Sequence, residues 1–343
     1  MISLDGSHGE GGGSMLRYAL ALATLTQKPF RMYAIRKGRD KPGLKPQHLF
    51  CIRGLEDLCG AVSEGAEIGS LDVTFYPRPV SKDSISIAIG TAGSVTLLLQ
   101  AFMLPLLFQK RTIVKVTGGT DVPFSQPYDY FTQVFLSALA PYGDIECSLE
   151  RRGFYPKGDG KLSLVVKGRY NYPEPGLPVF NYFERGDVQS LAGVSYATSL
   201  LEKADVALRM KKAARHILPD VKIREEYAPS ASDGAGIVLW ATYEKTVLGA
   251  SALGKRGVRA EDVGRQAGED MKREMDSSAV VDRHLADQLI PYMGAVTRAS
   301  GKECVIKTSE ITDHLRSNVY VTEAFLDVSF QIDGNQVTCT KTI

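Results

Sequence analysis

A histidine near the C-terminal end of the chain has the setting of a nucleophile. His314 lies in the segment EITDHLR, residues 310–316, where a helix is expected to begin with Thr312 or Asp313 as its N-cap. The positive end of a helix dipole disfavours imidazolium, and a neutral imidazole is the form that can attack an electrophile. The alternative is a structural histidine that caps the helix or fills a polar hole.

A glycine-rich segment near the N-terminus has the composition of an anion-binding helix start. Residues 10–17 read EGGGSMLR and lead into the helical sequence YALALATLTQ. Glycines let backbone N–H groups approach an anion, and the helix dipole favours an anion there. No Gly-Lys-Ser/Thr follows, so the pattern is not a Walker A loop. Glu10 could hold a metal ion and Arg17 could reach a phosphate, whereas a plain glycine-rich turn is the alternative.

A basic loop follows at residues 36–48, which read RKGRDKPGLKPQH. Between residues 31 and 48, one acid, Asp40, stands against six cations: Arg31, Arg36, Lys37, Arg39, Lys41 and Lys45. A charged loop is usually just solvated. Here Gly and Pro fix the backbone beside a glycine-rich helix start, which favours a phosphate site that also includes Gln47 and His48.

These residues must be positioned by a repeated α/β framework. Apolar periodicity predicts helix, strand, helix and strand three times along the chain. The two helices of each copy start about 32 or 33 residues apart. The first copy has helices from about 14 and over 47–61, with strands 30–36 and 71–76. The second has helices 94–108 and 128–141, with strands 85–89, 112–117 and 162–167. The third has helices from 279 to 293 and from about 313, with strands 303–308 and 328–332.

The segment 187–276 does not follow this repeat. It contains predicted strands at 188–196, 221–227 and 236–243 and predicted helices at 199–218 and 260–275. We therefore expect an α/β (α+β) fold in which residues 1–186 and 277–343 form a large catalytic domain of three α/β repeats. Residues 187–276 are expected to form an inserted small α/β domain that interrupts the third repeat.

Composition limits the class of protein. The chain has 343 residues, 44% of them hydrophobic, with a net charge of +2. The five cysteines form no CxxC pair, which argues against a disulfide framework or a zinc site. The N-terminus does not read as a signal peptide, and the apolar run 95–108 is too short to span a bilayer. We expect a soluble protein of the cytoplasm, or of the nucleus in a eukaryote, without a membrane partner.

Seven segments, in order along the whole chain, resemble the RNA 3′-terminal phosphate cyclase family. They read DGSHGEGGGSMLR, RKGRDKPGLKPQH, IGTAGSVTLLLQ, GGTDVPFSQP, RGFYPKGDG, HLADQLI and HLRSNVYVTE. The repeats with an insert also agree with that family's architecture. A related branch of ribosome-assembly proteins lacks the catalytic histidine, whereas this chain has His314 at the matching position. The resemblance is therefore to the active branch.

The resemblance implies an ATP-dependent reaction in three steps. A histidine Nε2 attacks the α-phosphate of ATP and releases pyrophosphate, and AMP then passes to the RNA 3′-phosphate. The vicinal 2′-hydroxyl finally expels AMP and leaves a 2′,3′-cyclic phosphate. Adenylylation makes AMP the leaving group, and each step needs charge neutralised around phosphoryl groups by Mg²⁺ or Mn²⁺, arginines and helix N-termini.

The resemblance also assigns roles to residues. His314 corresponds to the adenylylated nucleophile and Glu10 to the residue that meets the divalent metal. Asp287 either holds the ribose or supports His314. The nucleotide site is implied at Gln100, Pro127, His284, Leu285, Ala286, Asp287 and Gln288. The RNA terminal phosphate or the ATP tail is expected at Arg17, Arg36, Arg39, Gln47 and His48.

Two features depart from the family pattern, and two other readings of the chain exist. His284 stands where the family often has a tyrosine, and no aromatic residue near Val247 is available to face adenine opposite Pro127.

One rival reading is a non-catalytic RNA-binding or ribosome-assembly protein on the same fold. The other is an enolpyruvyl transferase, which also uses repeated α/β lobes. The sequence specifies neither the physiological RNA nor the oligomeric state.

Overall fold

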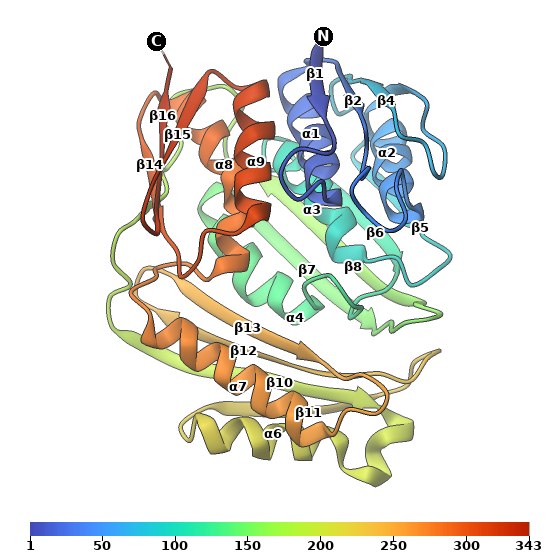
Figure 1. Ribbon diagram of the computed structural model, residues 1–343, viewed down its shortest axis with the longest axis vertical. Helices are drawn as coiled ribbons and strands as arrows, with labels where there is room; N and C mark the ends of the chain where they lie inside the picture. Colours follow the sequence, from blue (N-terminus) through green and yellow to red (C-terminus); the bar gives the residue numbers. More distant parts are fainter. Residues whose placement is uncertain (343) are drawn as a thin grey trace.

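Four four-stranded β-sheets and the helices packed on them make up the protein, seen here in a computed structural model that describes residues 1–342 (Figure 1). Three of the sheets repeat one chain path, and the fourth belongs to an insertion. The α/β class expected from the sequence is confirmed. No helix in this part of the chain is both long and apolar enough to cross a membrane.

The first unit sets the pattern. It consists of β1 (Ile2–Asp5), α1 (Gly13–Thr26), β2 (Phe30–Tyr33), α2 (Pro46–Cys59), β3 (Val62–Glu64) and β4 (Val73–Tyr76). Its strand order is β1-β2-β4-β3, with β1 parallel to β2 and the other neighbours antiparallel. The parallel pair needs a crossover, which α1 provides.

The second and third units have the same strand order. The second consists of β5 (Ser84–Ala88), α3 (Val95–Leu106), β6 (Thr112–Gly118), α4 (Tyr128–Tyr130), η1 (Phe131–Phe135), α5 (Leu136–Leu139), η2 (Ala140–Tyr142), β7 (Gly143–Arg151) and β8 (Gly160–Gly168). The third consists of β9 (Asn181–Tyr182), α8 (Arg283–Ser300), β14 (Cys304–Lys307), α9 (Asp313–Phe325), β15 (Val328–Asp333) and β16 (Gln336–Lys341). The orders are β5-β6-β8-β7 and β9-β14-β16-β15. The predicted threefold repeat is thus present, with two strands more than predicted in the first and third units and one more in the second.

The helices of the three units meet in the middle of the molecule. In Figure 1, α1, α3, α8 and α9 lie together, with the sheets of the units around them. Every residue of α3 is buried, as are those of α1 from Ser14 to Thr24. A helix that is buried all round is expected to be apolar, and α1 and α3 are mostly so; the exceptions include Arg17 in α1 and Gln100 in α3. The N-termini of these helices are therefore held in fixed positions by a shared core.

An inserted α/β segment separates β9 from α8, the first strand and first helix of the third unit. It comprises β10 (Val188–Thr198), η3 (Ser199–Ala204), α6 (Val206–Ile217), β11 (Lys222–Ala228), β12 (Ala235–Tyr243), β13 (Val247–Leu253) and α7 (Ala260–Asp276). Helices α6 and α7 pack on one face of its sheet around a core of its own that includes Met210, Leu239 and Met271. We propose that this segment is the small domain predicted at 187–276.

Several predicted boundaries are wrong. The predicted strand 30–36 ends at Tyr33, because Ala34 and Arg36 have positive φ values of 52° and 55°. The predicted helix 279–293 is α8, which starts after Asp282, whose carboxylate accepts from the backbone N–H groups of His284 and Leu285. The predicted helix 199–218 begins with a 3-10 turn, and α6 starts only at Val206.

Candidate active site

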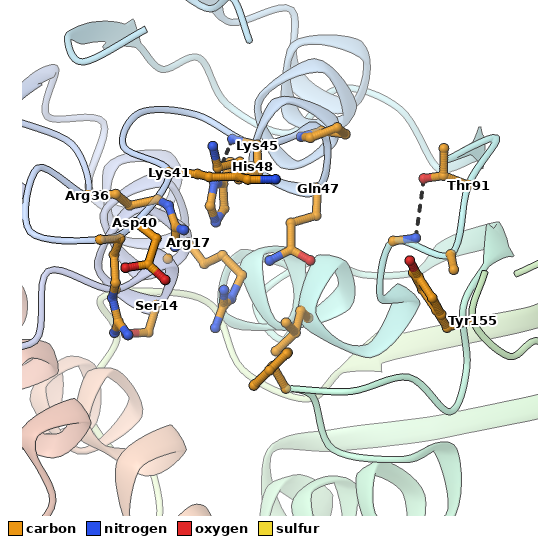
Figure 2. A pocket seen from close by; sticks show the side chains of 18 of the residues that line it. Ser14, Arg17, Arg36, Asp40, Lys41, Lys45, Gln47, His48, Thr91 and Tyr155 are labelled. Atoms are coloured by element: carbon orange, nitrogen blue, oxygen red, sulfur yellow. Dashed lines mark hydrogen bonds between the residues drawn. The ribbon is translucent and has the colours of Figure 1, made fainter. Parts of the chain in front are cut away.

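A pocket of about 770 Å³ lies where the three units meet. Seven residues predicted to be functional line it: Glu10, Arg17, Arg36, Arg39, Gln47, His48 and His314. The second unit contributes a further wall: Thr91, Ala92, Gly93, Leu97, Phe124, Tyr155 and Pro156. Figure 2 shows Arg36 and Lys41 on one side of this pocket and Thr91 and Tyr155 on the other. The sequence-derived catalytic and phosphate residues are therefore one site in space.

Helix N-termini converge on the pocket. Gly13 begins α1, Pro46 begins α2, and His314 lies in the first turn of α9. The Thr312 side chain caps α9 by accepting from the backbone N–H of Leu315 at 3.0 Å. The N-termini of helices carry partial positive charge and unpaired N–H groups. Three such ends around one cavity favour a ligand with several negative charges.

His314 contacts a carboxylate. Its Nδ1 lies 2.6 Å from Glu10 Oε2, while the other oxygen of Glu10 accepts a hydrogen bond from Arg39. The Ser14 hydroxyl also lies 3.5 Å from Nδ1. A neutral ring with its proton on Nδ1 would face the Glu10 carboxylate with that proton and keep the lone pair on Nε2. Burial lowers the pKa of His314, and the cations Arg17 and Arg39 lower it further against the opposing effect of Glu10. The geometry and the charges therefore favour a neutral imidazole with a free Nε2.

Arg17 is a buried cation without an acidic partner. It is 7% exposed, and within residues 1–342 it forms no ion pair and its Nε has no hydrogen-bond partner. Burial lowers the pKa of its guanidinium. Five cations line the pocket against two acids, Glu10 and Asp40. A buried, unpaired guanidinium is costly, so this arrangement fits a site that takes up an anion such as a phosphate.

His48 lies at the start of α2 and is 1% exposed. Its Nδ1 accepts from the Lys45 backbone N–H at 3.0 Å. Burial, with Arg17 and Arg36 nearby, lowers the pKa of this histidine to about 3, so the ring is neutral. Its Nε2 lies against Gly13, where a Cβ would come within 2.2 Å. His48 thus holds α2 against α1 in addition to lining the predicted phosphate site.

The predicted nucleotide residues lie outside the wall of this pocket. Gln100 and Pro127 are buried, and the Gln100 amide lies 3.5 Å from the Gln126 side chain. The His284 ring contacts Tyr130 edge to face at 6.3 Å. Gln288 is buried, and neither polar atom of its side chain has a partner in the described structure. A buried amide without partners fits a place where a polar ligand enters.

Asp287 supports the helix that carries His314. The Thr312 hydroxyl donates to Asp287 Oδ1 at 2.5 Å, and the Asn318 amide donates to the Asp287 backbone carbonyl at 2.8 Å. Burial raises the pKa of the Asp287 carboxyl to about 7. Of the two roles expected for Asp287, support of the His314 helix is thus visible in its contacts.

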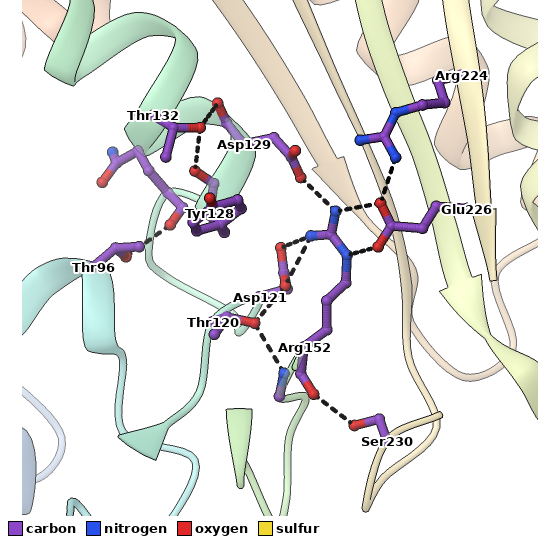
Figure 3. Close-up of polar contacts among 12 residues, drawn as sticks. Thr96, Thr120, Asp121, Tyr128, Asp129, Thr132, Arg152, Arg224, Glu226 and Ser230 are labelled. Atoms are coloured by element: carbon purple, nitrogen blue, oxygen red, sulfur yellow. Dashed lines mark hydrogen bonds and ion pairs between the residues drawn. The ribbon is translucent and has the colours of Figure 1, made fainter. Parts of the chain in front are cut away.

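A buried arginine anchors the loops that carry the second unit's wall of the pocket. Figure 3 shows Arg152 surrounded by carboxylates. It lies 3.2 Å from Asp121, 2.7 Å from Asp129 and 2.7 Å from Glu226 of β11, and its guanidinium lies 3.9 Å from the centre of the Tyr196 ring. This network joins the second unit to the insert.

The described residues hold no cluster of three or more potential metal-ligating side chains. Magnesium bound with a nucleotide commonly uses one or two carboxylates and completes its shell with phosphate oxygens and water. Glu10 at the mouth of the cationic pocket fits that mode, with Asp40 as a second carboxylate in the same lining.

Sequence reasoning missed the two exposed aromatic residues of the wall, Phe124 and Tyr155. Both lie in segments that carry the family resemblance, GGTDVPFSQP and RGFYPKGDG. Aromatic residues inside polar, glycine-rich loops were the available signal, because such loops offer no core for a large ring.

Replacing Gly13 with alanine is expected to destabilise the protein by about 1–3 kcal/mol, because the new Cβ would overlap the fixed His48 ring. Urea unfolding would measure the loss. Gly38→Ala is the matched control, since no atom lies within 4 Å of its Cβ position. Equal stability of the two variants would contradict the assigned packing.

Asp287→Asn is expected to change the pH dependence of stability. A carboxyl with a folded pKa of about 7 binds its proton more tightly in the folded state than in the unfolded state. Its contribution to the free energy of unfolding is therefore lost as pH rises from about 4 to 7. The amide keeps an acceptor for Thr312 but does not titrate. The unfolding midpoint of the variant should therefore rise relative to wild type between pH 5 and 8. A constant difference over this range would refute the assignment.

Arg152→Ala is expected to destabilise the protein by about 3–5 kcal/mol, since it leaves buried carboxylates unpaired. Arg224→Ala removes only an exposed partner of Glu226 and should change stability little. Thermal unfolding of the two variants at neutral pH provides the comparison. Similar melting temperatures for both would show that the network does not stabilise the fold.

Comparison with known proteins identifies the family of the chain. The family model for RNA 3′-terminal phosphate cyclase matches residues 8–332. A protein of Thermococcus onnurineus (strain NA1) with that name is 44% identical over 340 residues, covering 97% of this chain and 96% of its own. A protein of Archaeoglobus fulgidus with the same name is 43% identical, covering 98% of this chain and 99% of its own. The chain belongs to the RNA 3′-terminal phosphate cyclase family.

Proposed function

We propose that this protein converts the 3′-terminal phosphate of an RNA into a 2′,3′-cyclic phosphodiester at the expense of ATP. The observation that carries the proposal is the setting of His314 on a cationic pocket. Its Nδ1 lies 2.6 Å from Glu10 Oε2 and burial lowers its pKa, which favours a neutral imidazole whose Nε2 can attack. Family membership agrees with the substrate, because the curated relatives are named for it.

In the first step, His314 Nε2 attacks the α-phosphorus of ATP. A P–N bond forms, the bond to the pyrophosphate oxygen breaks, and pyrophosphate leaves. Glu10 keeps the proton on Nδ1 and stabilises the positive charge that develops on the ring. Arg17, Arg36 and the helix N-termini offset the negative charge of the phosphates.

In the second step, an oxygen of the RNA 3′-phosphate attacks the same phosphorus and breaks the P–N bond, which gives RNA-(3′)pp(5′)A. The 2′-hydroxyl then attacks the 3′-phosphorus, loses its proton and expels AMP. Arg17 and Arg36 would hold the terminal phosphate; the proposal is supported by the absence of an acidic partner for either in the described structure. Gln47 and the Lys45 side chain extend this phosphate site.

The proposed reaction also requires a divalent cation and a place for the nucleoside of ATP. Glu10 would hold Mg²⁺ or Mn²⁺ when ATP is bound, and the cation would neutralise phosphate charge. The nucleoside of ATP would lie beside Gln100, Pro127 and residues 284–288, where Gln288 offers an unpaired buried amide. Cytoplasmic localisation is part of the same proposal and agrees with five cysteines that form no disulfide.

The alternative is an RNA-binding or ribosome-assembly protein without catalysis. Such a protein would need the cations but no nucleophile. The pairing of His314 with Glu10 has no evident purpose in binding alone, so it favours the enzyme.

Wild-type protein incubated with α-³²P-ATP and Mg²⁺ or Mn²⁺ is expected to acquire acid-labile label on the 37.4 kDa chain, on the peptide that contains His314. His314→Ala should lose the label and still bind RNA, because the cations remain. The exposed His216→Ala, on α6, is the matched control and should label normally. Retained label in His314→Ala would mean another nucleophile, and no label in wild type would favour the assembly factor.

A further inference from the structure

Two large aromatic rings lie exposed on the wall that the second unit contributes to the pocket. Phe124 is fully exposed and Tyr155 is 68% exposed, and both line the cavity. Figure 2 shows Tyr155 beside Thr91, on the side of the cavity away from Arg36. Rings of this size gain stability when covered, so two of them on one cavity wall indicate a ligand that covers them.

The loops that carry the rings are tied together. An isolated parallel bridge pairs Asp121 with Phe154, so the segment leading to Phe124 runs alongside the segment leading to Tyr155. Arg152 lies next to this bridge, holds Asp121 by an ion pair and thereby fixes both loops. The rings are therefore presented on a rigid support.

Each loop packs into the protein through one buried residue close to the exposed ring. Val122 and Phe154 are buried, and the Ser125 hydroxyl donates to the Val122 carbonyl at 2.9 Å. Phe124 itself has a φ of 64°, in the left-handed region that bulky side chains rarely adopt. Such strain persists where the surrounding structure imposes it, and it is concentrated at ligand sites.

We propose that Phe124 and Tyr155 stack on the unpaired bases at the 3′ end of the RNA, an inference that rests on the proposed function. The pocket presents cations at one side and aromatic rings at the other, as the two chemical parts of a nucleotide require. Single-stranded RNA is commonly bound through cations on its phosphates and aromatic rings on its bases.

This subsite determines which RNA ends are accepted. Stacking on a ring is available to every base, so the rings give affinity without sequence preference. The last base of a blunt duplex is paired and has one face stacked on the neighbouring pair, so it can be splayed onto the rings only if that pair is broken. The protein therefore selects single-stranded 3′ ends over blunt ones. The adenine of ATP is the competing occupant, and the proposal assigns it to the separate residues around Gln288.

The test uses a short 3′-phosphorylated RNA with 2-aminopurine as its last base, titrated with protein in the absence of ATP so that no chemistry occurs. Wild type is expected to bind and to quench the fluorescence by stacking. Phe124→Ala and Tyr155→Ala should each weaken binding about tenfold and reduce the quenching. Phe124→Tyr and Tyr155→Phe should restore both. Phe183→Ala, which removes an exposed ring outside the pocket, is the control and should behave as wild type.

An abasic last nucleotide separates stacking from general damage. Wild type should lose about tenfold in affinity for the abasic RNA, whereas a double variant, Phe124→Ala with Tyr155→Ala, has neither ring and should bind it as well as the intact RNA. Unchanged binding of the intact RNA by both single alanine variants would overturn the stacking inference and leave the proposed function standing. Loss of AMP labelling without RNA would place the rings on adenine and also overturn it. Failure of wild type to bind the RNA would overturn the proposed function together with this inference.

Discussion

The carboxylate of Glu10, shared between Arg39 and His314, is the interaction on which the site depends. It joins the glycine-rich segment and the basic loop of the first unit to a helix of the third, so it forms only when the units are assembled. In a neutral His314 it favours the tautomer with the proton on Nδ1. The buried helices supply the remaining condition, because a shared apolar core fixes where α1, α2 and α9 begin.

Much of this could be predicted from the sequence because it is local. A few consecutive residues are enough to predict the glycines before α1, the turns of the basic loop and the cap of α9. The order of the seven segments then indicates the family. Seven of the predicted residues indeed line one pocket. The repeated α/β class followed from apolar periodicity, although short strands such as β1 and β9 carry too few residues for a periodic signal.

Long-range contacts could not be predicted in the same way. Asp287 of α8 contacts Thr312, the N-cap residue of α9. The sequence left open whether Asp287 binds the ligand or supports the helix of His314. His48 looked like a phosphate ligand, yet its position depends on Gly13, more than thirty residues away. The wall with Phe124 and Tyr155 forms because two loops pair through Asp121 and Phe154. The sequence of neither loop predicts this pairing. Both loops belong to segments that carry the family resemblance, but the resemblance assigned no function to Phe124 or Tyr155.

The Arg152 network has a consequence for how the chain can diverge. One of its acids, Glu226, belongs to the insert, while the arginine and the other acids belong to the second unit. The insert is therefore not an independent module that can be exchanged freely between relatives. A transplanted insert would need an acid at the matching position of β11. Without it, the buried arginine of the recipient would have one carboxylate partner fewer. Substitutions on the two sides of this contact should accumulate together during evolution.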